Sequence, residues 1–492
     1  MAKKAVIIGS GFAGLSAASF LAKAGWQVDV LEKHDQPGGR ARHFKAEGFT
    51  FDMGPSWYWM PDVFDRYFSR FNKTVSDYYE LIRLDPSYRI YWDDELMDIP
   101  ANYADLKKLF EELEPGAGKQ LDAFMEEASY KYRVGINKLV FKPGQSLMEF
   151  LDMELIRGLF KLDVFNDIKN HIGKFFKHPK LRQMMEFPVL FLGALPENTP
   201  ALYSLMNYAD VKLGTWFPKG GMYKIVEGMH KLAVEQGVCF HFNEDVSAIN
   251  VDENGVANSV ISKSGKQFSA DVVVGAADYH FIESKLLEKK YRSYSEKYWD
   301  KRAMAPGCLI YYVGLNTKIN DLPHHSLFFD VPFDQHSAEI YTNPSWPKEP
   351  LFYLSATSVT DESQAPAGCE NLFFLIPIAA GLDGDTEAIR DHYFDILSDR
   401  LKDRTGVDIR NHIVYKRAYA YSDFVGDYNA FKGNAYGLAN TLMQTAILKP
   451  SCVSKKVKNL YYTGQLTVPG PGVPPSLISG EVVAGLIDKK LG

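Results

Sequence analysis

The stretch that decides the fold is AVIIGSGFAG at residues 5–14, an apolar strand that runs directly into a Gly-x-Gly-x-x-Gly turn. In such a turn Gly9 allows the tight bend and Gly11 lets the backbone approach a pyrophosphate, while Gly14 lets the next helix pack closely on the strand. The stretch therefore predicts the first half of a dinucleotide-binding unit.

The residues that follow complete this unit. A helix is expected over residues 15–25 and a second apolar strand over residues 28–31. Glu32 then falls where a carboxylate binds ribose hydroxyls, and the N-terminus of the helix offers unpaired amides to the phosphates. This order of elements predicts an α/β fold with a parallel sheet.

The loop after the acidic residue indicates which dinucleotide is bound. It reads PGGRAR at residues 37–42, with Gly39 beside two arginines, Arg40 and Arg42. The planar fork of arginine binds phosphate oxygens with two hydrogen bonds. A Gly-Gly-Arg sequence after the ribose-binding acid resembles FAD proteins of the amine-oxidase and carotenoid-desaturase superfamily.

Composition excludes several classes of partner. The 492 residues are enough for two domains, and 55 basic against 61 acidic residues give a net charge of -6, which does not favour nucleic acid. The four cysteines are scattered and form no Cys-x-x-Cys pair, so we expect buried, inert thiols and no metal site. The first strand leaves no room for a signal peptide, and no apolar run is long enough to cross a bilayer. We therefore expect a cytoplasmic protein.

The C-terminal segment carries a second strong signal. A strand is expected over residues 459–464, followed by the rigid loop TVPGPGVPP at residues 467–475 and an apolar helix over residues 477–491. The N-terminus of a helix aimed at a flavin ring would stabilise the negative charge that develops on its N1 and C2 oxygen upon reduction.

With these segments in place, the chain resembles the bacterial-type phytoene desaturases and their relatives. The resemblance rests on motifs that span nearly the whole chain, namely residues 9–14, 38–40, 51–56, 216–222 and 464–474. It implies that Gly9, Gly11, Phe12, Ala13, Glu32, Gly39 and Arg40 hold the adenosine and pyrophosphate of FAD. It also implies that Val246 offers its backbone to the adenine, and that Gly54, Pro55, Gly464 and Val473 lie nearer the flavin.

The order of elements predicts two interleaved lobes. Residues 102–191 have mainly helical spacing, and strand patterns return after Gly237 and again between residues 307 and 422. We expect a Rossmann-type FAD-binding domain over residues 1–100, 215–300 and 440–492. Residues 101–214 and 301–439 are expected to form an α+β substrate lobe, made of a sheet and a helical part that faces the membrane.

The resemblance implies a FAD-dependent carotenoid desaturase that transfers a hydride from a polyene such as phytoene to flavin N5, while the neighbouring carbon loses a proton. The sequence does not identify the proton acceptor, for which the candidates are Asp52, His171, His178, Asp210 and Glu227. Nor does it identify the terminal electron acceptor, oxygen or a quinone. Residues 57–60, WYWM, either form an aromatic wall for the substrate or fill the core.

A carotenoid must be taken from a bilayer, so we expect peripheral membrane association. Rings alternate with lysines at residues 141–143, 160–161 and 174–177, and such segments either insert rings at the headgroup level or form solvated helices with one face in the core.

Other functions share the same motifs. A 1'-hydroxycarotenoid 3,4-desaturase would have all of them. A carotene isomerase would use flavin without net electron loss, and an amine oxidase would need a compact polar pocket for an ammonium group. A module that carries FAD only as a structural element is the remaining alternative.

Overall fold

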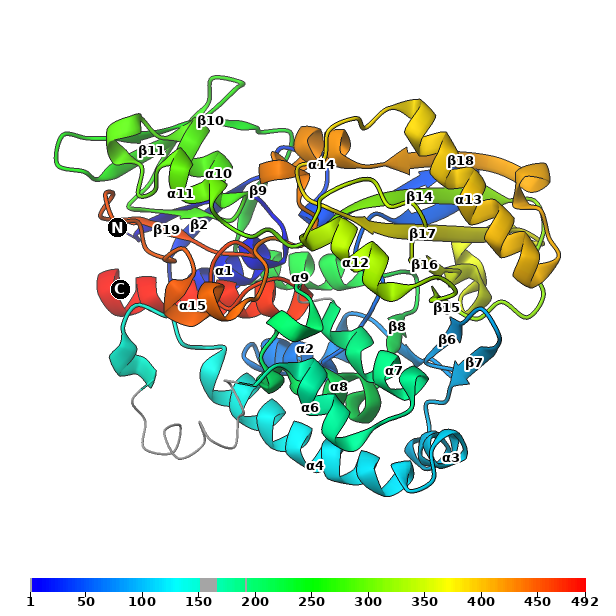
Figure 1. Cartoon of the computed structure of the whole chain (residues 1–492). Coiled ribbons are helices and arrows are strands. Elements are labelled where there is room, and N and C mark those ends of the chain that lie inside the picture. Colours follow the sequence, from blue (N-terminus) through cyan, green and yellow to red (C-terminus); the bar gives the residue numbers. More distant parts are fainter. Residues whose placement is uncertain (1, 151–165, 191–192) are drawn as a thin grey trace.

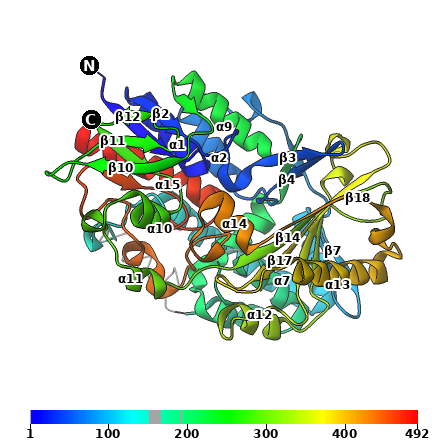
Figure 2. The same cartoon turned by 90° about the horizontal axis from the view of Figure 1, so that it is seen from above.

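The computed structural model describes residues 2–150, 166–190 and 193–492. A five-stranded parallel sheet with helices α1 and α15 lies at one end of the molecule, and a seven-stranded sheet with helix α13 lies at the other (Figures 1 and 2). A helical region lies below both sheets in the view of Figure 1. The predicted α/β fold is confirmed.

The parallel sheet has the strand order β19-β13-β1-β2-β9, and every neighbouring pair runs parallel. Its strands are β1 (Lys4–Ile8), β2 (Gln27–Leu31), β9 (Cys239–His241), β13 (Val272–Gly275) and β19 (Leu460–Tyr462). The central strands read as continuous apolar runs because both faces are covered. One face packs against α1 (Phe12–Lys23) and α15 (Val473–Leu491). The other face packs against the antiparallel sheet of β10 (Val246–Val251), β11 (Ala257–Ser262) and β12 (Gln267–Ser269).

The two ends of the chain meet at the parallel sheet. Helix α15 crosses α1 so closely that a Cβ atom on Gly480 would lie 2.5 Å from the carbonyl oxygen of Ala13 and 2.7 Å from the amide nitrogen of Ala17. The Lys3 ammonium donates to the carbonyl of Leu491 and, at 3.3 Å, to that of Gly492. The closeness of the chain ends is also visible in Figure 1.

The seven-stranded sheet has the order β18-β14-β17-β16-β15-β6-β7, and only the pair β15–β6 is parallel. Its strands are β6 (Tyr88–Tyr91), β7 (Leu96–Ile99), β14 (Gly307–Leu315), β15 (His325–Phe328), β16 (Phe352–Ser355), β17 (Glu370–Ile378) and β18 (Ile413–Tyr419). One face packs on α13 (Glu387–Thr405), and the other contributes to the largest apolar cluster of the protein. Strands β6 and β7 come from the stretch assigned to the first lobe, yet they pair within this second sheet.

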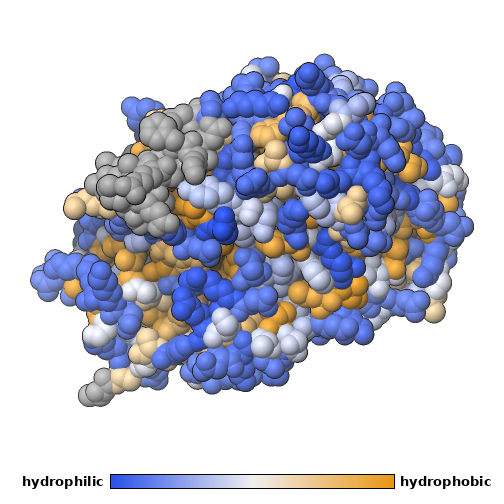
Figure 3. Space-filling view, turned by 90° about the horizontal axis from the view of Figure 1, so that it is seen from below, coloured by the Kyte–Doolittle hydropathy of each residue, from blue (hydrophilic) through white to orange (hydrophobic). Residues whose placement is uncertain are grey.

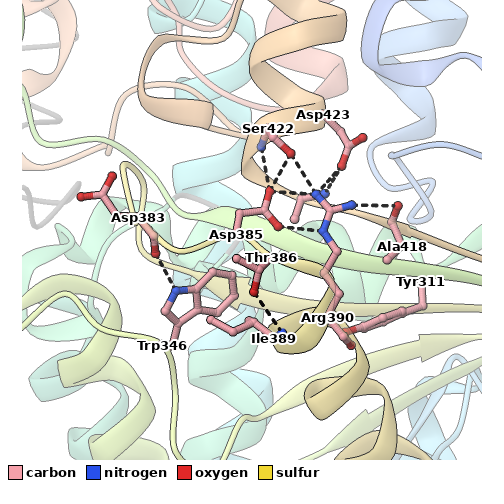
Figure 4. A network of polar contacts seen from close by, with 11 residues as sticks. Tyr311, Trp346, Asp383, Asp385, Thr386, Ile389, Arg390, Ala418, Ser422 and Asp423 are labelled. Carbon is pink, nitrogen blue, oxygen red and sulfur yellow. Dashed lines mark hydrogen bonds and ion pairs between the residues drawn. The ribbon is translucent and has the colours of Figure 1, made fainter.

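An arginine fixes the start of α13 to its surroundings. The Arg390 guanidinium donates to both carboxylate oxygens of Asp385, at 2.7 and 2.8 Å, and to Asp423 at 2.7 Å (Figure 4). It also donates to Ser422 at 3.0 Å, so the clamp joins α13 to helix α14 (Tyr421–Tyr428). The bidentate pair with Asp385 gives the guanidinium a defined orientation. The bonds from the same guanidinium to Ser422 and Asp423 then hold α14 beside the sheet.

The remaining elements complete the two lobes. The other strands form two small antiparallel pairs, β3 (His43–Ala46) with β4 (Phe49–Asp52) and β5 (Leu81–Arg83) with β8 (Trp216–Pro218). The remaining helices are α2 (Pro61–Ser69), α3 (Tyr103–Leu113), α4 (Ala117–Val134), α6 (Ile168–Phe175), α7 (Pro179–Leu190), α8 (Leu205–Tyr208), α9 (Tyr223–Glu235), α10 (Tyr279–Phe281), α11 (Glu296–Asp300) and α12 (Phe333–Tyr341).

The described rings that were expected to face the membrane are buried to different degrees. Phe176 is fully buried and packs against Phe110 and Phe124, and Phe175 packs edge-on against Phe124. Phe141 lies 3.8 Å from the Arg66 guanidinium. The segment 160–161 lies outside the described residues. Phe176 therefore fills the core between α3, α4 and α6, and Phe175 is partly buried against that core, while membrane association itself stays a prediction.

Candidate active site

One continuous cavity of about 470 Å³ runs between the parallel sheet and the seven-stranded sheet. All the predicted cofactor residues line it, namely Gly9, Gly11, Phe12, Ala13, Glu32, Gly39, Arg40, Gly54, Pro55, Val246, Gly464 and Val473. Residues from both ends of the chain thus face the same space.

The Gly-x-Gly-x-x-Gly turn has the geometry that its sequence predicts. Gly9 has a φ of +100°, which favours glycine, and a Cβ on Gly14 would lie 2.0 Å from the carbonyl oxygen of Gly9. A Cβ on Gly11 would meet no atom within 4 Å, so the backbone there faces open space. The turn leaves room for a phosphate at the N-terminus of α1.

Glu32 is held in place at the end of β2. Its carboxylate accepts hydrogen bonds from the Ser10 amide at 2.9 Å, from the Ser10 hydroxyl at 2.6 Å and from the His34 amide at 3.0 Å. A carboxylate has about four acceptor positions, so these three bonds leave capacity for ribose hydroxyls.

Of the two arginines after Gly39, only Arg40 faces the cavity. Its guanidinium donates to the Asn434 carbonyl at 3.2 Å and lies 5.2 Å from the centre of the Tyr428 ring, while its buried Nε has no partner among the described residues. Burial lowers the pKa of Arg40. Arg42 instead pairs with Asp427 at 2.8 Å and does not line the cavity. A buried, incompletely bonded guanidinium fits an anionic pyrophosphate.

The opposite end of the cofactor region is built around Gly464 and the N-terminus of α15. The Gly464 amide donates to the Ser479 hydroxyl at 3.0 Å, and the Thr463 hydroxyl lies 2.9 Å from the same oxygen. A Cβ on Gly54 would lie 2.5 Å from the Arg40 carbonyl, which requires glycine there. The first residues of α15, from Gly472 to Ser476, line the cavity, as predicted for a helix that faces a flavin.

Sequence reasoning missed several residues of this region. Ala277 and Asp278 follow the end of β13, and Tyr428 lies at the end of α14; all three line the cavity. Asp278 could have been found, because ligands in such sheets bind outside the carboxyl ends of the parallel strands. Tyr428 carries no comparable signal in the sequence.

The rest of the cavity is lined mainly by apolar side chains. Trp57 and Trp59 of the WYWM segment line it together with Met60, so part of this segment forms a wall, whereas Tyr58 does not face the cavity. The other apolar lining residues come mainly from α7, α12 and the seven-stranded sheet, and include Phe187, Ile310, Leu327, Phe329, Phe333, Ile340, Leu351 and Leu375. A long hydrocarbon fits such a lining.

None of the five proposed proton acceptors lines the cavity, although all five lie among the described residues. They are Asp52, His171, His178, Asp210 and Glu227. Asp52 accepts hydrogen bonds from the Met222 and Tyr223 amides at 2.7 and 2.9 Å, and Asp210 accepts one from the Tyr88 hydroxyl at 2.9 Å. These two carboxylates hold structural elements together.

The cysteines are all free, but Cys239 is exposed, contrary to expectation. Its sulfur lies within 4.8 Å of ligand atoms of two other residues. These are Asp29 on the neighbouring strand β2 and His241, which is on β9 like Cys239 itself. The His241 Nε2 is 2.7 Å from Asp29 Oδ1, so these two residues form an ordinary pair across β2 and β9. The group lies outside the cavity.

Comparisons with known proteins agree with this architecture. A family model described as flavin containing amine oxidoreductase matches residues 12–487. A carotenoid 3,4-desaturase from Haloarcula japonica is 42% identical over 97% of this chain and 96% of its own length. A zeta-carotene-forming phytoene desaturase from Myxococcus xanthus is 31% identical over 98% and 93%. The crystal structure of an oxidoreductase from Methanosarcina mazei superimposes with a TM-score of 0.64 at 14% identity, over 98% of this chain and all of that one.

Proposed function

Since the chain belongs to the family of flavin containing amine oxidoreductases, we propose that it is a carotenoid desaturase that introduces carbon–carbon double bonds into a long polyene. The predicted family and flavin cofactor are confirmed, and FAD is its cofactor. The observation that carries the proposal is the single cavity, in which a dinucleotide-binding end continues into an apolar end.

The residues of this chain divide the task between them. Glu32 and Arg40 are proposed to hold the ribose and the pyrophosphate, and Gly54, Gly464 and Val473 to border the flavin. When bound, oxidised FAD supplies the hydride acceptor. The walls of Trp57, Trp59 and Met60 position the substrate and exclude water, and orientation of this kind accounts for a large share of the rate.

The charge distribution disfavours an amine as the substrate. Among the described residues, the carboxylates that line the cavity are Glu32, Glu244, Asp245, Asp278 and Asp427, and all of them lie in the dinucleotide-binding part. An ammonium group in the apolar part would have no carboxylate partner within the described ranges, and burying an unpaired charge is costly. A polyene requires no such partner.

Desaturation at the 3,4 position is the more specific proposal, because the 42% identical relative carries that name. The test is to supply purified enzyme in liposomes with phytoene and, separately, with a 1'-hydroxycarotenoid. Product absorbance reports the length of conjugation. Faster conversion of the hydroxycarotenoid supports 3,4-desaturation, whereas conversion of phytoene alone would assign the enzyme to the phytoene desaturases. Absence of flavin reduction with either polyene would overturn the function.

We also propose that the enzyme docks on a membrane surface. Met148, Met443 and Leu448 are 78%, 71% and 43% exposed. They lie on segments that touch each other, since Gln145 and Ser451 are hydrogen-bonded at 3.2 Å. Hydrophobic residues also reach the surface on the underside of the molecule (Figure 3). Within the described residues, no helix is both long and apolar enough to cross a bilayer. Co-sedimentation with liposomes tests the proposal, and a protein that stays in the supernatant at low salt would refute it.

A further inference from the structure

A tyrosine–histidine pair lies in the wall of the apolar cavity, and the desaturation proposed above does not yet use it. Tyr353 on β16 lines the cavity, and its hydroxyl lies 2.7 Å from Nδ1 of His325 on the neighbouring strand β15. His325 is fully buried and Tyr353 is 7% exposed. Tyr353 thus borders the cavity, whereas His325 does not line it.

The pair lies beside the motif that is proposed to border the flavin. Trp57 follows Gly54 and Pro55 in the sequence, and its ring stacks on the His325 ring at 4.1 Å with an angle of 16° between planes. The rings of Trp57 and Tyr353 are 5.4 Å apart, and both residues line the cavity. The Tyr353 side chain thus lies beside the aromatic wall of the cavity.

Burial favours the neutral form of both side chains. Burial lowers the pKa of His325, which the neighbouring His324 lowers further, and burial raises the pKa of Tyr353. A neutral imidazole has one acceptor nitrogen, and a tyrosine hydroxyl has one proton to donate. We infer that Tyr353 donates to Nδ1, so that the His325 proton resides on Nε2, which is buried and has no partner among the described residues.

We propose that Tyr353 is the catalytic residue that accepts the proton lost by the polyene, and that His325 accepts the tyrosine proton in turn. This proposal rests on the proposed desaturase function. After a hydride has left one carbon, the C–H bond on the neighbouring carbon breaks and its two electrons form the new double bond. The proton moves to Tyr353 Oη while the tyrosine proton moves to His325 Nδ1. The charge of the substrate cation thereby ends on the imidazolium.

A weak base is sufficient for this step. A carbocation next to a C–H bond is a very strong acid, so an acceptor need not have a high pKa to remove its proton. A carboxylate in this place would be charged at rest, and burying that charge in an apolar cavity is costly. The pair avoids this cost, and the Trp57 ring stacked on the imidazole stabilises the cation formed after transfer.

The other groups around His325 do not replace it in this role. The His324 ring lies 4.4 Å away, nearly perpendicular, and its Nδ1 is 2.7 Å from the Thr360 hydroxyl. His336 does line the cavity, but its two nitrogens contact the Pro377 carbonyl at 2.9 Å and the Leu351 amide at 2.9 Å. His336 is therefore already bonded on both sides.

The test compares Tyr353→Phe and His325→Asn with the wild-type holoenzyme and with Tyr311→Phe. In His325→Asn, the oxygen of the new amide side chain replaces Nδ1 as a hydrogen-bond acceptor but cannot take up a proton. Tyr311 lies in the same sheet, with its hydroxyl bonded to the Arg390 carbonyl on the face away from the cavity. It controls for the loss of a buried hydroxyl.

The first readout is anaerobic flavin reduction by the polyene in liposomes, at saturating and at limiting substrate. The substrate cation takes its hydride back unless its proton is removed, so net flavin reduction depends on the proton acceptor. General base catalysis contributes typically about 10² to 10⁴-fold, and we therefore expect about 100-fold slower net reduction in both variants, with little change in the half-saturating concentration. Tyr311→Phe should reduce flavin at the wild-type rate. Variants of the pair that reduce flavin as fast as wild type would refute the proposal, whereas a wild-type enzyme that no polyene reduces would refute the function itself.

The second readout is independent of turnover. Histidine-selective ¹⁵N NMR of the holoenzyme should show a neutral His325 with a proton on Nε2 and an acceptor Nδ1, assigned by the loss of its signals in His325→Asn. The Nδ1 signal should shift in Tyr353→Phe and stay in place in Tyr311→Phe. A His325 that is charged at neutral pH, or protonated on Nδ1, would exclude the proton transfer described here.

Discussion

The close crossing of α1 and α15 makes Gly480→Ala an informative perturbation. A Cβ at this position would lie 2.5 Å from the Ala13 carbonyl oxygen, 2.6 Å from the Ser16 Cβ and 2.7 Å from the Ala17 amide nitrogen. Two of these atoms belong to the backbone of a buried helix and cannot rotate away. Overpacking costs typically about 1–3 kcal/mol, and a contact this short belongs at the upper end.

The same helix provides a matched control, Gly485→Ala. Gly485 is exposed, and a Cβ there would meet no atom within 4 Å. Replacing a helical glycine by alanine gains about 1 kcal/mol in both variants. We therefore expect Gly485→Ala to be stabilised by about 1 kcal/mol and Gly480→Ala to be destabilised by about 2 kcal/mol, a separation of about 3 kcal/mol.

The assay is urea unfolding of the two variants and the wild type, followed by circular dichroism, together with the ratio of bound flavin to protein. Because α15 carries Val473 and fixes Gly464 through Ser479, a displaced α15 should also lower the flavin content of Gly480→Ala. The reasoning fails if both alanine variants unfold at the same urea concentration and retain the same amount of flavin.

Three further predictions concern the cofactor, pH and the membrane. Arg40→Lys keeps the charge but loses the planar fork, so the dissociation constant for FAD measured by fluorescence titration should rise about tenfold, the equivalent of one charge-assisted hydrogen bond; an unchanged constant would exclude Arg40 from the pyrophosphate site. Burial raises the pKa of Asp210 to about 7, so between pH about 4 and 7 the unfolded chain has lost a proton that the folded chain keeps, and stability falls as pH rises. The urea midpoint of Asp210→Asn should therefore rise relative to the wild-type midpoint as the pH is raised from about 4 to 8. A difference between the two midpoints that does not depend on pH would contradict this. Paired Met148→Glu and Met443→Glu substitutions should reduce co-sedimentation with liposomes several-fold, whereas Val359→Glu at another exposed site should not; equal binding by all variants would place the membrane contact elsewhere.

Local motifs were readable from the sequence because their geometry is set by neighbouring residues. The turn at Gly9 and Gly11, the position of Glu32 and the helix after the C-terminal proline-rich loop follow from backbone constraints within a few residues. From these motifs the parallel sheet could be predicted, and so could the meeting of both chain ends at one cofactor site.

Contacts between distant segments could not be read in the same way. Trp57, His325 and Tyr353 meet only because β15 pairs with β16 and the WYWM segment packs on that sheet. Arg42 binds Asp427, which is 385 residues away in the sequence. Arg40 lines the cavity, and Arg42 does not. The rings at residues 175 and 176 illustrate a different limit, because an amphipathic helix with lysines looks the same whether its apolar face meets a core or a lipid.

Strand β19 lies at the edge of the parallel sheet, where it covers the open side of β13. Because β19 follows the other four strands of this sheet in the sequence, a nascent chain exposes the open side of β13 until β19 has been synthesised. An unpaired edge of this kind is a template for aggregation. Because β19 adds at the edge of the sheet, its pairing requires no threading through preformed structure. Flavin binding must wait until the cavity residues Gly464 and Val473 have been synthesised. We therefore expect production in cells to depend on chaperones that shield this edge, and truncations that remove β19 to yield insoluble, colourless protein.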